Sequence, residues 1–119
     1  MKTLVLGASP NPARYAYLAT ERLLRHGHEV ILVGNRPGAI ENQPILTETY
    51  AGRDVDTVTL YLGPARQVDY YDYLVEELRP RRIIFNPGTE NAELRARAMA
   101  AGIETEDACT LVMLGAGTY

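Results

Sequence analysis

A chain in which short apolar runs alternate with amphipathic stretches has few folds open to it, and this sequence is such a chain. Five runs are predicted to be strands: Thr3–Leu6, Glu29–Val33, Thr57–Leu62, Arg82–Phe85 and Ile103–Thr105. Their apolar residues are nearly continuous, which is typical of parallel strands covered on both faces. One further short edge strand is expected near Ile45–Thr47, within the looser stretch Ala39–Asp56.

The amphipathic stretches between these runs have apolar residues at helical spacing. Helices are predicted over Ala13–His26, Ala65–Leu78, Glu90–Ala101 and Ala108–Leu114, and Thr89 is expected to cap the third. Crossovers between parallel strands are right-handed, which leaves few arrangements. The predicted fold class is α/β, a Rossmann-type doubly wound open sheet of about five parallel strands with helices on both faces. Such sheets bind ligands outside the carboxyl ends of the strands, where the strand order reverses.

Composition and charge limit the classes of partner that this protein is expected to bind. The 119 residues are 46% hydrophobic and 23% charged, which suits one globular domain over residues 1–119. The formal net charge of −3 gives no general attraction to nucleic acid or to an anionic membrane, so neither is expected as a partner. A few local groups must then hold any anionic ligand. The first apolar run is too short for a signal peptide or a membrane span, so the expected location is cytoplasmic.

Cysteine and histidine usage argues against a metal site. Cys109 is the only cysteine, which excludes an intramolecular disulfide and a cysteine cluster for zinc or iron–sulfur. His26 and His28 flank a glycine at a predicted helix-to-strand turn and lack the i, i+4 spacing of helical metal ligands. No metal is expected.

The loop after the first strand has the composition of an anion site. Gly7 allows a tight turn or a close approach to a ligand, and Ser9 offers a hydroxyl. Pro12 suits the first turn of a helix, and Arg14 is expected in the same turn, where exposed N–H groups attract anions. The alternative is an ordinary α/β turn with a solvated arginine. The loop is not the dinucleotide G-x-G-x-x-G, because Ser9 and Pro12 occupy the second and third glycine positions.

The end of the second strand narrows the choice of nucleotide. Domains that prefer NAD carry Asp or Glu there, whereas this chain has Asn35 and Arg36. A cation at this place favours a nucleotide with an additional ribose phosphate, either NADP or coenzyme A. The alternative is a surface arginine in an exposed turn.

Four segments in order resemble the stand-alone CoA-binding domain family. They are Gly7-Ala8-Ser9-x-x-Pro12-x-Arg14, Asn35-Arg36-Pro37-Gly38, Phe85-Asn86-Pro87-Gly88-Thr89-Glu90-Asn91 and Asp107-x-Cys109. The family is related to the N-terminal CoA-binding domain of the succinyl-CoA synthetase α subunit. The resemblance covers essentially the whole chain.

This resemblance implies that CoA lies across the strand ends. Gly7, Ser9 and Arg14 would hold the phosphates, with Pro12 in the same loop, and Asn35 and Arg36 the adenosine end. The rim of the cleft would consist of Leu62, Gly63, Pro64, Asn86, Pro87 and Gly88. The family places Cys109 on the same rim, either as a small buried side chain or as a thiol near the pantetheine arm that could form a mixed disulfide with CoA.

The leading functional hypothesis is a module that binds CoA or an acyl-CoA without chemistry of its own. No catalytic set can be placed in the sequence, so the output would be regulatory or would pass through an unidentified protein partner. An NADP-dependent oxidoreductase is a second hypothesis, for which 119 residues leave little room. A third is an interaction module with a vestigial nucleotide cleft. The apolar segment Leu111–Leu114 is either core or a dimer contact, so the chain is expected to be a monomer or a homodimer.

Overall fold

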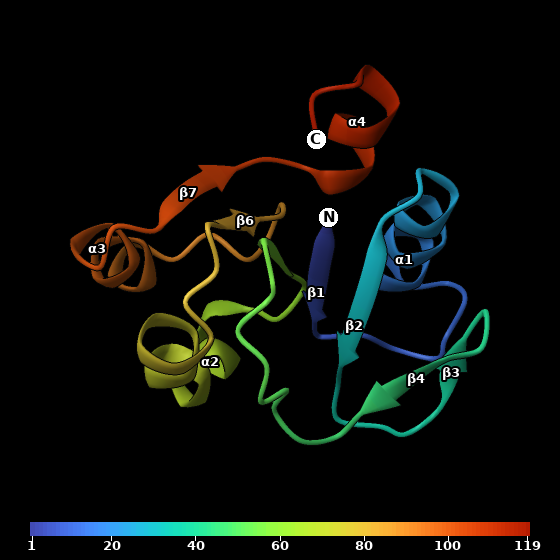
Figure 1. Ribbon diagram of the computed structural model, residues 1–119, viewed down its shortest axis with the longest axis horizontal. Helices are drawn as coiled ribbons and strands as arrows, with labels where there is room; N and C mark the ends of the chain where they lie inside the picture. The colour runs from blue at the N-terminus through green and yellow to red at the C-terminus, as the bar shows by residue number, and fades with distance from the viewer.

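The computed structural model describes residues 1–119 and places seven strands in one sheet (Figure 1). The strands are β1 (Lys2–Leu6), β2 (Glu29–Val33), β3 (Ala39–Ile40), β4 (Gln43–Leu46), β5 (Thr57–Leu60), β6 (Arg82–Phe85) and β7 (Glu104–Asp107). Their order is β3-β4-β2-β1-β5-β6-β7, and every neighbouring pair is parallel except the β3–β4 hairpin. The predicted doubly wound α/β fold is confirmed.

The strand order reverses beside β1. From β1 the chain adds β2 and β4 on one side, and it then crosses back to place β5, β6 and β7 on the other side. The carboxyl ends of β1 and β5 therefore border the crevice at which doubly wound sheets bind their ligands.

The edge beyond β2 differs from the prediction. In place of a single strand near Ile45–Thr47, β3 and β4 form a hairpin in which Ile40 pairs with Gln43. Glu41 and Asn42 form its two-residue turn with φ values of 47° and 70°, because a type I′ turn requires positive φ at both central residues.

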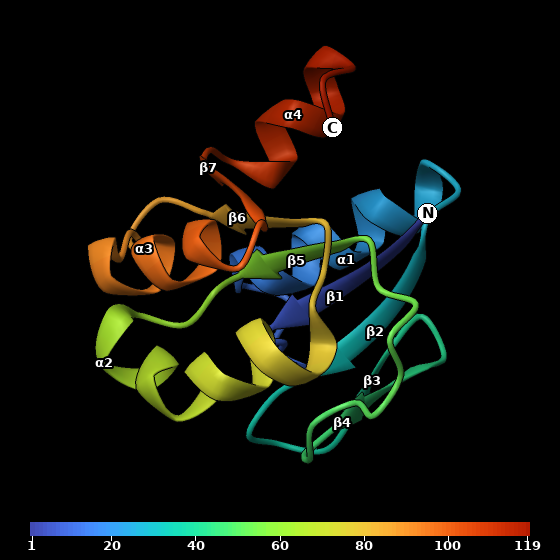
Figure 2. The ribbon, with the colours of Figure 1, turned by 60° about the vertical axis from the view of Figure 1, so that its left-hand side comes forward.

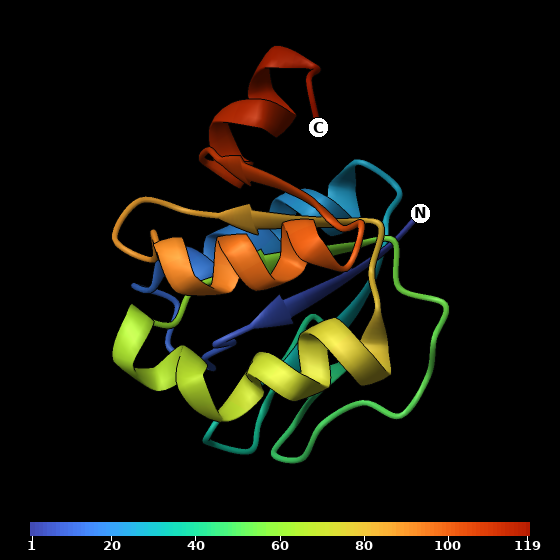
Figure 3. The same cartoon turned by 90° about the vertical axis from the view of Figure 1, so that its left-hand side faces the viewer.

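Helices cover both faces of the sheet (Figures 2 and 3). α1 (Tyr15–Arg25) and α4 (Thr110–Ala116) lie on one face. The other face carries α2 (Pro64–Gln67), η1 (Val68–Tyr70), η2 (Tyr73–Leu78) and α3 (Ala92–Ala100). Each layer buries an apolar core against the sheet, with Leu23 central on the first face and Leu74 on the second. None of the helices combines the length and the apolar composition that crossing a membrane requires.

Two details of the second helical layer depart from the prediction. The helix expected over Ala65–Leu78 is one helical path whose winding changes from α2 through η1 to η2. Asn91 caps α3 in place of Thr89: its Oδ1 accepts hydrogen bonds from the N–H groups of Glu93 and Leu94, at 3.1 and 3.2 Å. The Thr89 hydroxyl donates instead to the carbonyl of Asn86, at 2.8 Å, so it is not free to cap a helix.

The strand β7 forms the outer edge of the sheet opposite the hairpin. It is acidic and mostly exposed, with the sequence Glu-Thr-Glu-Asp. Each carboxylate pairs with an arginine of a neighbouring element: Glu104 with Arg81, Glu106 with Arg82 and Asp107 with Arg95. These pairs hold an otherwise polar strand against β6 and α3.

Candidate ligand-binding site

Gly7 lets the chain leave β1 at the reversal of strand order. Its φ is +99°, a left-handed value that favours glycine, and a Cβ there would lie 2.9 Å from the carbonyl carbon of Tyr61. The N–H groups of Gly7 and Ala8 both donate to the carbonyl of Val33, at 2.9 and 3.0 Å. The loop is thereby held between the ends of β2 and β5.

Two hydrogen bonds from backbone N–H groups to side chains fix the conformation of the rest of the loop before α1 begins. Ser9 Oγ accepts a hydrogen bond from the N–H of Asn11 at 3.1 Å, and Asn11 Oδ1 accepts one from the N–H of Ala13 at 3.0 Å. Because of this turn, Pro12 precedes α1 and does not stand in its first turn, which corrects the expectation. No side chain caps α1, so its first N–H groups and the positive end of its dipole are open to an anion.

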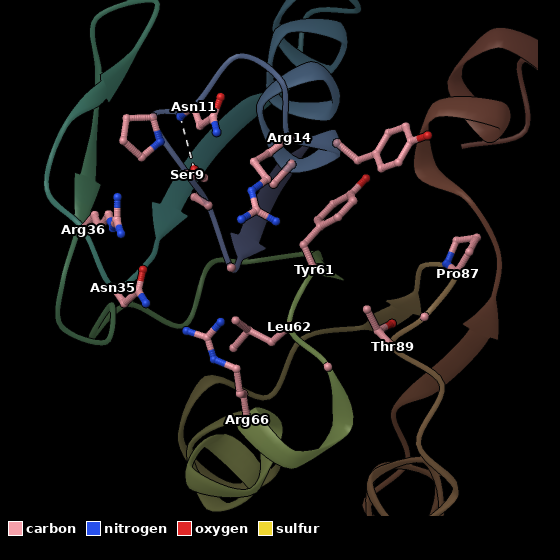
Figure 4. Close-up of a pocket in the computed structure, with 17 residues that line it drawn as sticks. Ser9, Asn11, Arg14, Asn35, Arg36, Tyr61, Leu62, Arg66, Pro87 and Thr89 are labelled. Atoms are coloured by element: carbon pink, nitrogen blue, oxygen red, sulfur yellow. Dashed lines mark hydrogen bonds between the residues drawn. The ribbon is translucent and has the colours of Figure 1, made fainter.

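A cavity of about 420 Å³ opens at this point (Figure 4). It is lined by residues 7–11, 14–16, 35–36, 61–63, 66 and 87–89, which come from the loops after β1, β2, β5 and β6. The candidate residues that border it are Gly7, Ser9, Arg14, Asn35, Arg36, Leu62, Gly63, Pro87 and Gly88. Residues predicted in four separate loops, those after β1, β2, β5 and β6, therefore line one cavity.

Four candidate residues do not line this cavity: Pro12, Pro64, Asn86 and Cys109. Pro64 is the first residue of α2, and half-buried Cys109 immediately precedes α4. The Asn86 side chain is buried and fully used within the protein. Its Nδ2 donates to Thr59 Oγ1 and to the carbonyl of Leu60, at 2.6 and 2.9 Å, and its Oδ1 accepts from the N–H of Thr110 at 2.8 Å. Asn86 thus ties the end of β6 to β5 and α4.

The sequence analysis missed two prominent side chains of the cavity, Tyr61 and Arg66. Tyr61 follows β5, and its ring forms part of the wall (Figure 4) while its hydroxyl is buried without a hydrogen-bond partner. Burial raises the pKa of Tyr61 well above its ordinary value of 10.0, so the phenol keeps its proton. Arg66 could have been found, because it stands in the first helical turn after a glycine-ended strand, as Arg14 nearly does.

All the charged side chains of the cavity are positive. Arg14, Arg36 and Arg66 come from three different loops, and none forms an ion pair within the protein. None of the 17 lining residues is acidic. In a chain with a net charge of −3, this cavity is a local concentration of positive charge that suits a polyanion.

The model of a protein family described as the CoA binding domain matches residues 1–115. The chain belongs to this family. The resemblance to CoA-binding domains that four sequence segments indicated is therefore confirmed, over nearly the whole length of the chain.

Solved structures share the fold of this CoA-binding domain. A crystal structure of an uncharacterized protein is 52% identical, with a TM-score of 0.95, and the match covers 99% of this chain and 97% of that one. A conserved hypothetical protein from Pyrococcus furiosus is 30% identical, with a TM-score of 0.76 and coverage of 87% and 90%. A Thermus thermophilus protein is 19% identical, with a TM-score of 0.85 and coverage of 99% and 90%, and shows the fold alone. None of the curated proteins matches the chain.

Proposed function

We propose that the protein binds coenzyme A or an acyl-CoA in the cavity at the ends of β1 and β5, as a module without catalytic chemistry of its own. The observation that carries this proposal is the convergence of Arg14, Arg36 and Arg66 on one cavity with no acidic side chain in its lining. CoA carries a diphosphate and a ribose phosphate, so its charge complements three arginines. The CoA-binding family supports the choice of this ligand.

The arrangement of the cavity supports one direction for the ligand. The open N-terminus of α1 and Arg14 suit the diphosphate, and Asn35 and Arg36 suit the adenosine end with its ribose phosphate. The pantetheine arm would then run past Tyr61 toward Pro87, on the side of β5 and β6. The loop after β6 contributes no charged group to the cavity, as an uncharged arm requires.

The residue types of the lining support binding and not catalysis. The 17 lining residues include no histidine, cysteine, lysine or carboxylate, so the hydroxyl groups of Ser9, Thr89 and the two tyrosines have no side-chain base in the lining to activate them. The consequence of ligand binding would then be regulatory, or would pass through a protein partner.

Thermal unfolding with different nucleotides tests this function. A ligand that binds only the folded state adds about 2.7 kcal/mol at 100 times its dissociation constant. For a domain of this size, that corresponds to a rise in melting temperature of roughly ten degrees. We expect millimolar CoA to give such a rise and NAD to give none. An equal rise with NAD or NADP and none with CoA would overturn the proposal.

A further inference from the structure

Two arginines approach the cavity from opposite faces of the sheet. Arg14 immediately precedes α1, which covers one face, and Arg66 lies in α2 on the other face. Both guanidinium groups point into the cavity and toward each other's side of it (Figure 4). Both side chains are exposed, and neither has an ion pair or a hydrogen bond to the protein.

Neither guanidinium group has a counter-charge in the lining of the cavity. Two guanidinium groups that share one cavity repel each other, and the absence of an acidic lining residue leaves the repulsion uncompensated. Elsewhere in the chain, arginines that lie close to the sheet are paired with carboxylates, as Arg81 and Arg82 are. An anion with oxygens on two sides would accept hydrogen bonds from both guanidinium groups, whose planar forks match phosphate oxygens.

The strand order indicates which part of a nucleotide these two arginines face. Arg14 and Arg66 belong to the loops after β1 and β5, the adjacent strands at the reversal of strand order. Arg36 follows β2, on the far side of β1 from β5, and lies apart from the other two in Figure 4. A phosphate bound at Arg36 is therefore a different phosphate from the one between Arg14 and Arg66.

We propose that Arg14 and Arg66 form a two-sided clamp on a diphosphate group, with Arg66 closing the side that the β1–α1 loop leaves open. The identity of the ligand as CoA rests on the proposed function, whereas the clamp itself concerns only the diphosphate. Removing either arginine leaves one side of the diphosphate to solvent.

Calorimetric titration with inorganic pyrophosphate and with CoA tests the clamp. We expect Arg66→Ala and Arg14→Ala each to weaken both ligands about tenfold, since these are charge-assisted hydrogen bonds at a partly solvated site. Arg66→Lys, which keeps the charge and loses the fork, should recover part of the affinity. The double variant should lose less than the product of the two single losses if both arginines hold one group.

The matched control is Arg53→Ala. Arg53 is exposed, has no ion pair and precedes β5, at the opposite end of the sheet from the cavity, and its loss changes the net charge by the same amount. We expect it to leave both affinities unchanged at equal ionic strength. The melting temperature of ligand-free Arg66→Ala should equal or exceed that of the wild type, because a repulsion has been removed.

The outcomes separate the clamp from the proposed function. Pyrophosphate binding that depends on Arg66, without CoA binding, would support the clamp and overturn the proposed function. CoA binding that is the same in Arg66→Ala as in Arg53→Ala would overturn the clamp and leave the function standing. A wild-type protein that binds neither ligand would overturn both.

Discussion

Under the proposed function, Arg36 is the residue by which the cavity would distinguish one nucleotide from another. It follows β2 at the place where NAD-selective domains carry a carboxylate, and it lines the cavity beside Asn35. CoA and dephospho-CoA share the diphosphate and the pantetheine arm, and they differ only in the phosphate on the adenosine ribose. Discrimination between these two ligands therefore reports on the groups that hold this phosphate, of which Arg36 is the charged one.

We predict that dephospho-CoA binds several-fold to about tenfold more weakly than CoA, because the lost contact is a charge-assisted hydrogen bond at an exposed side chain. In Arg36→Ala the preference should disappear, with the affinity for dephospho-CoA nearly unchanged. Titration calorimetry of two ligands against two proteins measures the coupling. Equal weakening of both ligands would show that Arg36 acts through its overall positive charge or by holding the loop in place. It would exclude a specific contact with the ribose phosphate.

A site residue could be predicted from the sequence where it lies in the loop that follows a predicted apolar strand. Gly7, Arg14 and Arg36 lie in the loops that follow the apolar strands β1 and β2, so their location at the carboxyl edge follows from the sequence. Arg66 carries the same local signal, a helical turn after a glycine-ended strand, but its meeting with Arg14 in one cavity depends on the pairing of β5 with β1, which no local pattern specifies. Asn86 also lies at a strand end, yet its amide turns inward, because Thr59 and Thr110 from distant parts of the chain supply its partners.

At the scale of the elements, one buried side chain joins three of them. Asn86 follows β6 and hydrogen-bonds to β5 and to the first residue of α4. Thr59 and Thr110 complete the network through a hydrogen bond of 2.8 Å between their hydroxyls. Since all of these groups are buried, none can turn to water if a partner is removed.

Asn86→Ala should therefore lower the free energy of unfolding by about 2–3 kcal/mol, because it leaves a buried N–H and a buried carbonyl unsatisfied. Urea unfolding measures the loss as a lower midpoint with an unchanged slope. The control Asn35→Ala removes an exposed amide and should change the free energy by less than about 0.5 kcal/mol. A loss below that value in Asn86→Ala would mean that the network contributes little.

The elements themselves were predictable in proportion to their burial. β2 and β6 have the predicted bounds because their apolar residues are continuous. The β3–β4 hairpin was not predicted as such, since β4 contains Pro44 and pairs with β2 over only two residues. Its register depends on the turn at Glu41 and Asn42, where asparagine favours positive φ but glutamate does not, so the pair lacks the signal of a typical two-residue hairpin turn.

On the scale of the whole molecule, the two ends of the sheet differ. The carboxyl end carries the arginine cavity, whereas the amino end buries polar side chains against one another. There, Arg82 lies 4.8 Å from the ring centre of Tyr119, and His28 meets the same ring edge to face, with 5.0 Å between centres. Tyr119 also hydrogen-bonds to Thr3, at 2.5 Å between the two hydroxyl oxygens.

This amino end should make the stability depend on pH. Burial lowers the pKa of His28 below its ordinary value of 6.5, and nearby positive charges, including Arg82, lower it further. The unfolded chain therefore binds the proton first as the pH falls, so stability is full above about 6.5 and is lost as the pH falls through that value toward the folded pKa. Urea unfolding at pH 7.5 and 5.5 should show the lower midpoint at pH 5.5.

His28→Phe keeps an aromatic ring against Tyr119 and cannot titrate, so it should reduce the difference between the two pH values. The matched variant His26→Gln removes an exposed imidazole two residues away. It should show the same difference between the two pH values as the wild type. A difference that is the same in His28→Phe as in the wild type would assign the pH dependence to other groups.

The acidic strand β7 also bears on how copies of this protein would meet one another. An outermost strand presents unpaired N–H and C=O groups, which are a template for another chain to continue the sheet. A second copy that added its own β7 would bring three further carboxylates to this edge, and the three arginines beside it are already paired on the inner side, so none remains for the incoming strand. We therefore expect this border to oppose the joining of sheets into longer assemblies.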